Sequence, residues 1–241
     1  RWPSNLGIMA LNTIMLRLLS PIAAVGVATS ASTNSWGFFN LFEAPLWFEV
    51  TLAIILLDAA IYFQHRMFHM VPVLWKAHRM HHTDIDFDVT TGVRFHPLEI
   101  ILSALIKLSV VLTLGASPIA VILFEILLNA TAMFNHGNVR LPIAVDRNLR
   151  LFIVTPDMHR VHHSIAANET NSNFGFNLPW WDHLFGTYLA QPEEGHKAMT
   201  IGINTFREPL NQRLDKLLMQ PLVDNANESI VINSEESDLK K

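Results

Sequence analysis

The side chains best suited to chemistry in this chain are its histidines, which number 12. Eight of them fall into three short motifs, with neighbours three or four residues apart. On a helix, residues at those spacings share a face and could reach one ion. The motifs are the H-x3-H pair His65 and His69, and two H-x2-H-H groups, His78, His81, His82 and His159, His162, His163. This pattern predicts a metal site built from imidazoles.

The number of histidines indicates more than one ion. The chain has no cysteine, which excludes thiolate metal sites, iron–sulfur clusters and a cysteine nucleophile. A structural zinc takes four ligands, and a catalytic zinc takes three and a water. Eight histidines, with His136 as a ninth candidate, exceed one such site. They suit two ions, each held by several imidazoles with an open position for oxygen.

Polar residues on the same helix faces are candidates for supporting these ligands. Asp58 lies seven residues before His65, and an acid within an apolar segment is a functional candidate, so we predict that it orients a histidine. Glu125 and Asn129 precede His136 on one helix face. They could support the metal site or form a polar contact between helices.

The elements that must position the histidines are four apolar stretches. Each is near the ~20 residues that cross a bilayer, only 16% of the residues are charged, and the mean hydropathy is +0.27. The last two are joined only by residues 115–117, as in a tight helical hairpin. The stretches cover about 6–28, 46–63, 98–114 and 118–134. We predict an all-α integral membrane protein with four transmembrane helices in two hairpins, rather than buried helices of a soluble protein.

The basic residues predict the orientation of these spans. Loops 29–45 and 115–117 contain no Lys or Arg, whereas all but two of the 17 basic residues lie on the opposite side, together with the histidine motifs. Because basic residues favour the cytoplasmic side, we expect a cytoplasmic histidine-rich face. The exceptions, Arg17 and Lys107, are expected to face the bundle or snorkel, unless the first stretch lies in the interface.

The remaining sequence predicts a single domain over residues 1–221. A helical cap over 64–97 and 135–221 carries most of the histidines, and the polar segment 222–241 is expected to be a disordered tail. The net charge of −4 gives no basis for binding nucleic acid.

The order of the motifs resembles the fatty acid hydroxylase / sterol desaturase superfamily, and is most similar to bacterial sterol desaturase family proteins. After the two motifs His65–His69 and His78–His82, the resemblance continues through Arg94–Glu99, Asn135-His136, Pro156–His163 and Trp181–Thr187. It implies four transmembrane helices, a cytosolic cap, O2 as co-substrate and two iron ions. The ligands it implies are His65, His69, His78, His81, His82, His136, His159, His162 and His163. One further position is left open for a water, Asn129 or His96, and His96 could instead support a ligand.

The function expected from this resemblance is the O2-dependent oxidation of a C–H bond in a membrane lipid such as a sterol or fatty acyl chain, by hydroxylation or desaturation, or cleavage of an ether lipid. The chain shows no haem-binding domain or nucleotide-binding loop, so the electron donor is expected to be a separate ferredoxin or cytochrome with its reductase. The expected location is the bacterial inner membrane.

Two other functions are open from the residues alone. A zinc-dependent membrane hydrolase would need a water-activating metal beside a carboxylate, but the H-E-x-x-H motif is absent. A non-enzymatic metal carrier would need ligands along a transmembrane path, whereas these histidines are predicted to gather at one face.

Overall fold

The computed structural model describes residues 1–19 and 23–224. In these residues the chain is helical and contains no β-strand; the β-type pairing present is an isolated bridge between Ser164 and Ile201. The prediction of an all-α fold is therefore confirmed. The predicted tail lies, from residue 225 onwards, outside the described residues.

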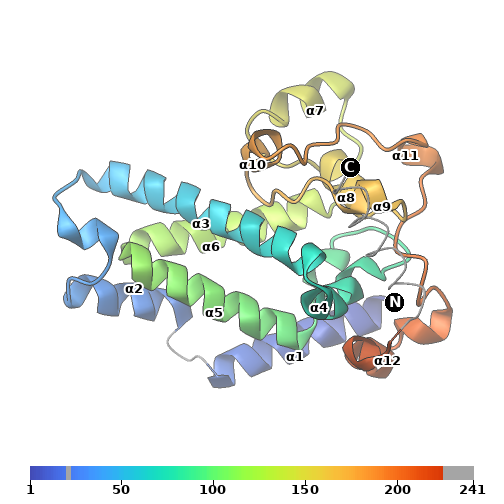
Figure 1. Ribbon diagram of the computed structural model, residues 1–241, viewed down its shortest axis with the longest axis horizontal. Coiled ribbons are helices and arrows are strands. Elements are labelled where there is room, and N and C mark those ends of the chain that lie inside the picture. Colours follow the sequence, from blue (N-terminus) through green and yellow to red (C-terminus); the bar gives the residue numbers. More distant parts are fainter. Residues whose placement is uncertain (20–22, 225–241) are drawn as a thin grey trace, which may run out of the picture.

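Four helical stretches are long and apolar enough to cross a membrane, which confirms the predicted number (Figure 1). They are Trp2–Leu41, which passes over the undescribed residues 20–22, then α3 (Leu46–Met70), α5 (Pro97–Leu114) and α6 (Pro118–Asn135). With so few charges in these stretches, the chain is an integral membrane protein.

The first stretch differs from the single span predicted over residues 6–28. It contains two helices, α1 (Trp2–Leu19) and α2 (Ala23–Thr33). Helix α1 packs against α5 and the cap helix α12 (Leu214–Met219), whereas α2 packs against α5 and α6.

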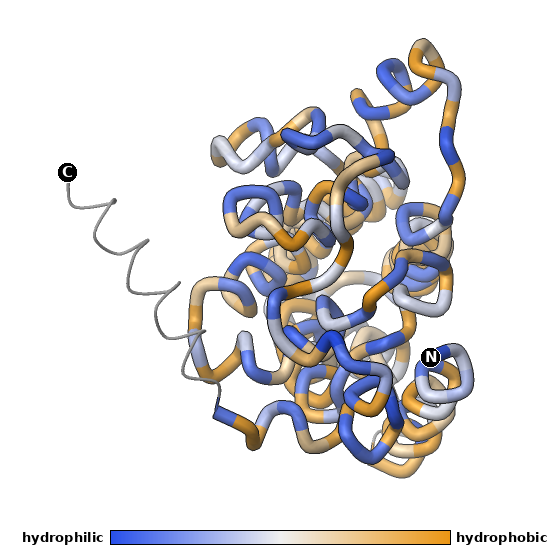
Figure 2. Tube along the Cα trace, turned by 90° about the vertical axis from the view of Figure 1, so that its right-hand side faces the viewer, coloured by the Kyte–Doolittle hydropathy of each residue, from blue (hydrophilic) through white to orange (hydrophobic). Residues whose placement is uncertain are grey.

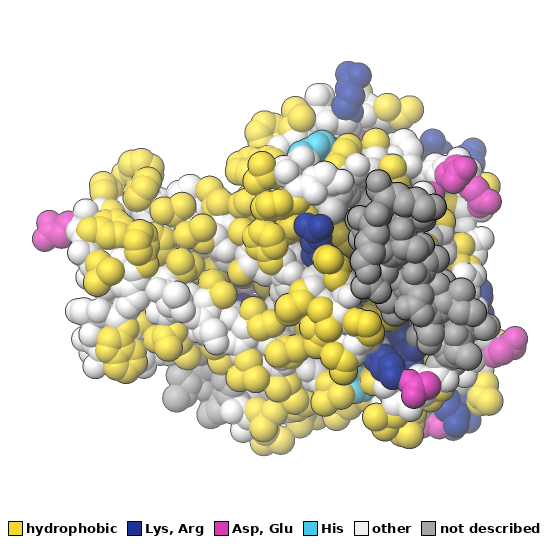
Figure 3. Space-filling view, in the orientation of Figure 1, with side chains coloured by type: hydrophobic (Ala, Val, Ile, Leu, Met, Phe, Trp, Pro, Cys, Tyr) yellow, Lys and Arg dark blue, Asp and Glu magenta, His cyan; other side chains and the backbone are white. Residues whose placement is uncertain are grey.

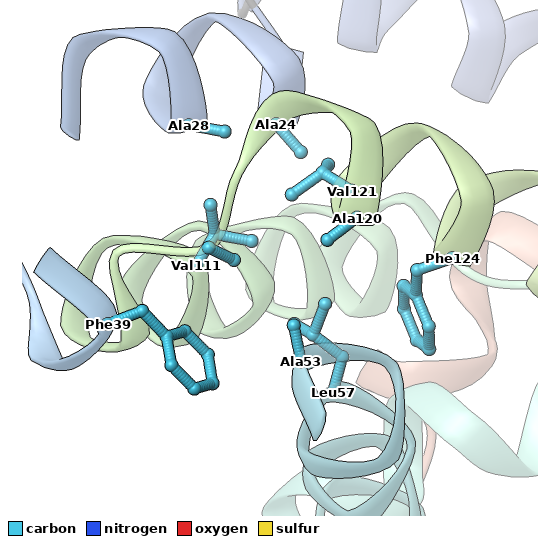
Figure 4. Packing of buried hydrophobic residues seen from close by; sticks show 10 residues of the cluster. Ala24, Ala28, Phe39, Ala53, Leu57, Val111, Ala120, Val121 and Phe124 are labelled. Carbon is cyan, nitrogen blue, oxygen red and sulfur yellow. The ribbon is translucent and has the colours of Figure 1, made fainter. Parts of the chain in front are cut away.

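Small side chains line the contacts between the spans (Figure 4). Lipid chains are as apolar as the helices, so spans associate by close packing, which small residues favour. The buried cluster consists of Ala24, Ala28, Phe39, Ala53, Leu57, Val111, Ala116, Ala120, Val121 and Phe124. This packing fixes the rotation of α3 and α6, and therefore the direction in which their polar residues point.

The two loops without Lys or Arg meet at one end of the bundle, as predicted. Glu49 Oε1 accepts a hydrogen bond from Ser117 N (2.8 Å), and Asn40 Nδ2 donates to Gly115 O (3.2 Å). Gly37 and Gly115 have φ of 90° and 65° and touch each other, so a Cβ at either would collide with backbone. On the face shown in Figure 3, Lys and Arg gather towards the opposite end.

Proline defines where the histidine-bearing helices begin. Helix α3 ends at Met70, because Val71 precedes Pro72 and has an extended backbone (φ −99°, ψ 114°). Pro72 is the first residue of α4 (Pro72–His82), and Pro156 is the first residue of α8 (Pro156–His162). The last turns of α3 and α4, together with α8, therefore meet at the end of the bundle.

The cap consists of short helices and turns around this meeting point, with hydrophilic segments interleaved among hydrophobic ones (Figure 2). Arg94 anchors the C-terminus of α4, since its buried guanidinium donates to Met80 O and Thr83 Oγ1, both at 2.8 Å. Besides α4, α8 and α12, the cap contains η2 (Thr91–Val93), α7 (Ile143–Leu149), α9 (Ala167–Thr170), α10 (Trp180–Leu184), α11 (Gly195–Ala198), η3 (Pro209–Gln212) and η4 (Gln220–Leu222).

Candidate metal centre

Nine histidines that are distant in sequence converge in two adjacent groups. In each group, one ligand atom per residue lies within 4.8 Å of all the others. The five-histidine group contains His65, His69, His78, His82 and His162; the four-histidine group contains His81, His136, His159 and His163. These are the same nine residues that the sequence nominated, and each group alone has enough imidazoles to hold an ion.

The H-x2-H-H motifs divide between the groups in a way that the spacing did not predict. His78 and His82, four residues apart on α4, share the five-histidine group, and His81 between them turns to the other group. The motif on α8 does the reverse. His159 and His163 belong to the four-histidine group, and His162 between them belongs to the five-histidine group. Each of these two motifs therefore contributes to both groups.

The spacing of nitrogen atoms in the four-histidine group suits a common ion. His136 Nε2 lies 3.3 Å from His81 Nε2 and 3.1 Å from His159 Nε2, and His163 Nε2 lies 3.3 Å from His159 Nε2. Two nitrogens that are each about 2.1 Å from one ion are about 3.0 to 3.4 Å apart, for octahedral to tetrahedral angles. These three separations are in the range expected for ligands of one ion.

In the five-histidine group, backbone and carboxylate acceptors fix three rings. His65 Nδ1 bonds to Phe174 O (2.9 Å), and His162 Nδ1 to Ser172 O (2.8 Å). His78 Nδ1 bonds to Glu99 Oε1 at 2.7 Å. These bonds place the proton on Nδ1 and leave Nε2 as the metal ligand. The Nε2 atoms of His78 and His162 are buried without a hydrogen-bond partner among the described residues.

The four-histidine group has fewer such partners. His136 Nδ1 bonds to Ala132 O at 2.9 Å, one turn back at the end of α6. The Nδ1 atoms of His81 and His159 are buried and find no hydrogen-bond partner in the part of the chain that the structure describes. Gly92 packs against His136, where a Cβ would lie 3.0 Å from the ring. This group is therefore held more by packing than by hydrogen bonds.

Burial keeps these imidazoles neutral. Loss of hydration lowers the pKa of His136 to about 4 and that of His162 to about 3. The same burial, together with repulsion from neighbouring imidazoles, lowers the pKa of His81, His82, His159 and His163 well below the ordinary value. Neutral imidazole is the form that binds metal, so this part of the site is ready for an ion at neutral pH.

A turn over residues 173–175 supports the five-histidine group, and sequence reasoning did not identify what holds it. Asp182 accepts hydrogen bonds from Phe174 N and Gly175 N, both at 2.8 Å, and burial raises its pKa to about 6. A Cβ at Gly175 would lie 2.6 Å from this carboxylate. Asn173, at φ 51°, donates to Met158 O on α8. The turn thereby aims Phe174 O at His65.

The predicted supporting residues lie outside both groups. Asp58 accepts from Asn177 N, Leu178 N and Trp181 Nε1, so it anchors the segment after the turn rather than a histidine. His96 caps α5 by accepting from Leu98 N, and its Nε2 lies 3.2 Å from Leu218 O. Asn129 is exposed and donates to Glu125 O. The residue that does contact a histidine, Glu99, was within the Arg94–Glu99 segment but was not singled out.

A cavity of about 200 Å³ joins both groups to the membrane-spanning helices. Its inner end is lined by His65 and His78 of one group and by His81, His136 and His159 of the other. Away from them, its wall is formed mainly by apolar residues of α1, α3, α5 and α6, such as Leu16, Ile61, Phe68, Ile100 and Leu128. The cavity has the composition of a binding site for an apolar chain.

Comparisons with known proteins agree with this geometry. The chain is 26% identical over 225 residues to alkylglycerol monooxygenase of Xenopus tropicalis, covering 89% of this chain and 47% of that protein. It is 28% identical over 221 residues to the human alkylglycerol monooxygenase, covering 86% and 46%. It is 32% identical over 173 residues to the ornithine lipid hydroxylase OlsE of Rhizobium tropici, covering 71% and 51%. No solved structure matches significantly.

The chain spans about half the length of these relatives. The model of the family described as fatty acid hydroxylase matches residues 50–187. That range runs from α3 to just after α10, contains all nine clustered histidines, and covers more than half of the chain. The chain therefore belongs to the fatty acid hydroxylase family.

Proposed function

We propose that this protein is an O2-dependent di-iron oxidoreductase that hydroxylates or desaturates a C–H bond of a membrane lipid. One observation carries the proposal: two groups of histidines, all buried except the partly buried His69, open together onto one cavity between membrane-spanning helices. The names of the relatives, a monooxygenase of alkylglycerol and a hydroxylase of ornithine lipid, support a lipid substrate.

The donor set fits iron. Imidazole nitrogen binds iron well, and the nine nitrogens are enough for two ions with positions left for oxygen. His65, His69, His78, His82 and His162 would hold one ion, and His81, His136, His159 and His163 the other. When bound, the iron would supply the reduction of O2 and the oxidation of the C–H bond.

The protein's own part is to hold, orient and seal the site. Phe174 O, Ser172 O and Glu99 keep three imidazoles in the ligand tautomer. Phe95 lies against His81, with the two rings stacked and their centroids 4.3 Å apart, and also lines the cavity. Such apolar walls exclude water and place a lipid chain beside the histidines.

The partners and location follow from the same proposal. Electrons would come from a separate ferredoxin or cytochrome with its reductase. The chain would lie in the bacterial inner membrane with its histidine-bearing end in the cytoplasm. The distribution of basic residues supports this orientation, because the loops at the opposite end contain no Lys or Arg.

The test is metal analysis of the detergent-purified protein, with Mössbauer spectra of iron-enriched material. We expect about two coupled irons per chain, and loss of the coupled signal in the double variant His81→Ala/His162→Ala, which removes one ligand from each group. The control is His183→Ala, because His183 is exposed and stacks on Tyr188 away from both groups. A single zinc, or no metal in a folded protein, would overturn the di-iron proposal and favour the hydrolase or carrier.

A further inference from the structure

An ion pair inside the membrane-spanning bundle is not used by the proposed chemistry. Lys107 Nζ of α5 lies 2.5 Å from Glu125 Oε1 of α6, and both side chains are partly shielded. Charged residues within a span are costly and tend to occur where they serve a function. The pair thus accounts for the mid-span lysine in the sequence, and its position suggests a role.

Lys107 lies on the wall of the same cavity that reaches the histidines. Glu99, Ser103 and Lys107, spaced four residues apart on one face of α5, all line it. This polar face extends about 12 Å along the helix from the histidine level into the span. The lining opposite is largely apolar, so the face is a polar strip in a hydrocarbon cavity.

A residue of α3 extends the strip. Gln64 Nε2 donates to Ser103 Oγ at 2.9 Å, while Gln64 Oε1 is buried with no hydrogen-bond partner among the described residues. A buried polar atom without a partner costs free energy. This amide oxygen is an acceptor, so a bound molecule with a donor group such as a hydroxyl at this level would remove that cost.

We propose that Gln64, Ser103 and Lys107 form a specificity site for a hydroxyl group of the lipid. This inference rests on the proposed function. The oxygen would bind one to two turns from Glu99, about 6 to 12 Å along α5. Binding there fixes how far the chain reaches, and so which carbon lies beside the histidines.

The available hydrogen-bond groups favour an uncharged oxygen. An ammonium has three N–H donors, and Glu125 occupies one of those of Lys107. The Ser103 hydroxyl accepts from Gln64 and can donate its own hydrogen. A lipid hydroxyl would thus receive hydrogen bonds from Ser103 and Lys107 and donate one to Gln64 Oε1. A carboxylate has no hydrogen to donate and would meet the negative charge of Glu125. A fatty alcohol should therefore bind better than the fatty acid of equal length.

The experiment measures equilibrium binding of tritiated 1-hexadecanol and tritiated palmitate to the purified protein in detergent, without an electron donor. We expect Ser103→Ala and Lys107→Met to weaken hexadecanol binding about three- to tenfold, as for a lost hydrogen bond. Ser109→Ala is the matched control, because Ser109 is exposed on the same helix and its hydroxyl donates to Leu105 O within that helix. Glu125→Gln should strengthen palmitate binding and abolish the preference for the alcohol.

Equal hexadecanol affinity in wild type, Ser103→Ala and Ser109→Ala would overturn the inference, as would an unchanged preference in Glu125→Gln. These two variants are small changes, so the test stands even if Lys107→Met does not fold. Binding needs no turnover. A protein that shows the expected binding pattern but contains no iron would refute the proposed function alone, and one with two irons but no binding pattern would refute this inference alone.

Discussion

The two histidine groups are neighbours, yet they are held in different ways. In the five-histidine group, three rings are fixed by hydrogen bonds that they donate to Ser172 O, Phe174 O and Glu99. In the four-histidine group, His136 has such a partner, and packing orients the other rings. Ligands oriented by hydrogen bonds bind metal more tightly. We therefore expect the five-histidine group to be the tighter site.

The comparison shows that ligand number and ligand support need not be shared equally within one centre. Both groups have walls on the cavity, but the four-histidine group presents three of its four members there, and the other group two of five. The less supported group is thus the one most open to the bound molecule. An ion with fewer protein ligands keeps more positions for oxygen.

Acidification should remove the difference in metal affinity between the two histidine groups, and we expect it to have the largest effect on stability and metal content. Unfolded histidine titrates near pH 6.5, whereas the pKa of His136 is about 4 and that of His162 about 3 in the fold. Between these values the unfolded state binds more protons, so the free energy of unfolding rises with pH. The stabilising contribution of these histidines is fully present above about pH 6.5 and is lost as the pH falls towards 4.

The measurement is the thermal midpoint and the retained iron from pH 7.5 to 4.5. Both groups should lose metal over this range, because protons compete for all the imidazoles. A midpoint and an iron content that stay constant down to pH 4.5 would contradict the assigned pKa values.

Removing one ligand from either group should distinguish the two groups by their metal content. His136→Ala leaves three imidazoles in its group, while His69→Ala leaves four in the other. We expect the metal content to fall from about two to about one ion per chain in His136→Ala and to stay near two in His69→Ala, since four nitrogens still suffice for an ion. The measurement is elemental analysis of both proteins. Equal losses would mean that the groups do not bind independently.

Glu99→Gln should weaken the five-histidine group selectively. The variant replaces the carboxylate that bonds to His78 Nδ1, and loss of such a partner costs about 10- to 100-fold in metal affinity. Competition with a chelator would measure the two affinities. Glu43→Gln, at an exposed position in the loop at the opposite end of the bundle, is the control. If the four-histidine site weakens instead, the assignment of support is wrong.

Asp182→Asn should have the smallest effect. An amide retains one acceptor oxygen but loses part of the bonding to Phe174 N, Gly175 N and Thr187 Oγ1. We expect a loss of about 1 to 2 kcal/mol and a thermal midpoint lower by several degrees. The chelator assay should show a small weakening of the five-histidine group alone, through Phe174 O and His65. A wild-type midpoint would show that the turn does not depend on this carboxylate.

Much of this protein could be predicted from its sequence because the determining features are local. Apolar length fixes the number of membrane stretches, and proline at Pro72 and Pro97 sets where helices begin. The spacing of the histidines nominated eight of the nine that the structure brings together, because residues three or four apart share a helix face, and His136 was added from its place after the last apolar stretch and from the family resemblance. The division of the first apolar stretch into α1 and α2 was not predicted.

The tertiary structure alone decided how those residues are used. Each of α4 and α8 supplies ligands to both groups. On each, the histidine three residues after the first one points away from the pair spaced four apart, so His81 and His162 each belong to the other group. Asp58 anchors a loop and Lys107 meets Glu125 because the packing of α3, α5 and α6 sets their rotation. Spacing tells which side chains share a face, but only packing between helices determines what that face meets.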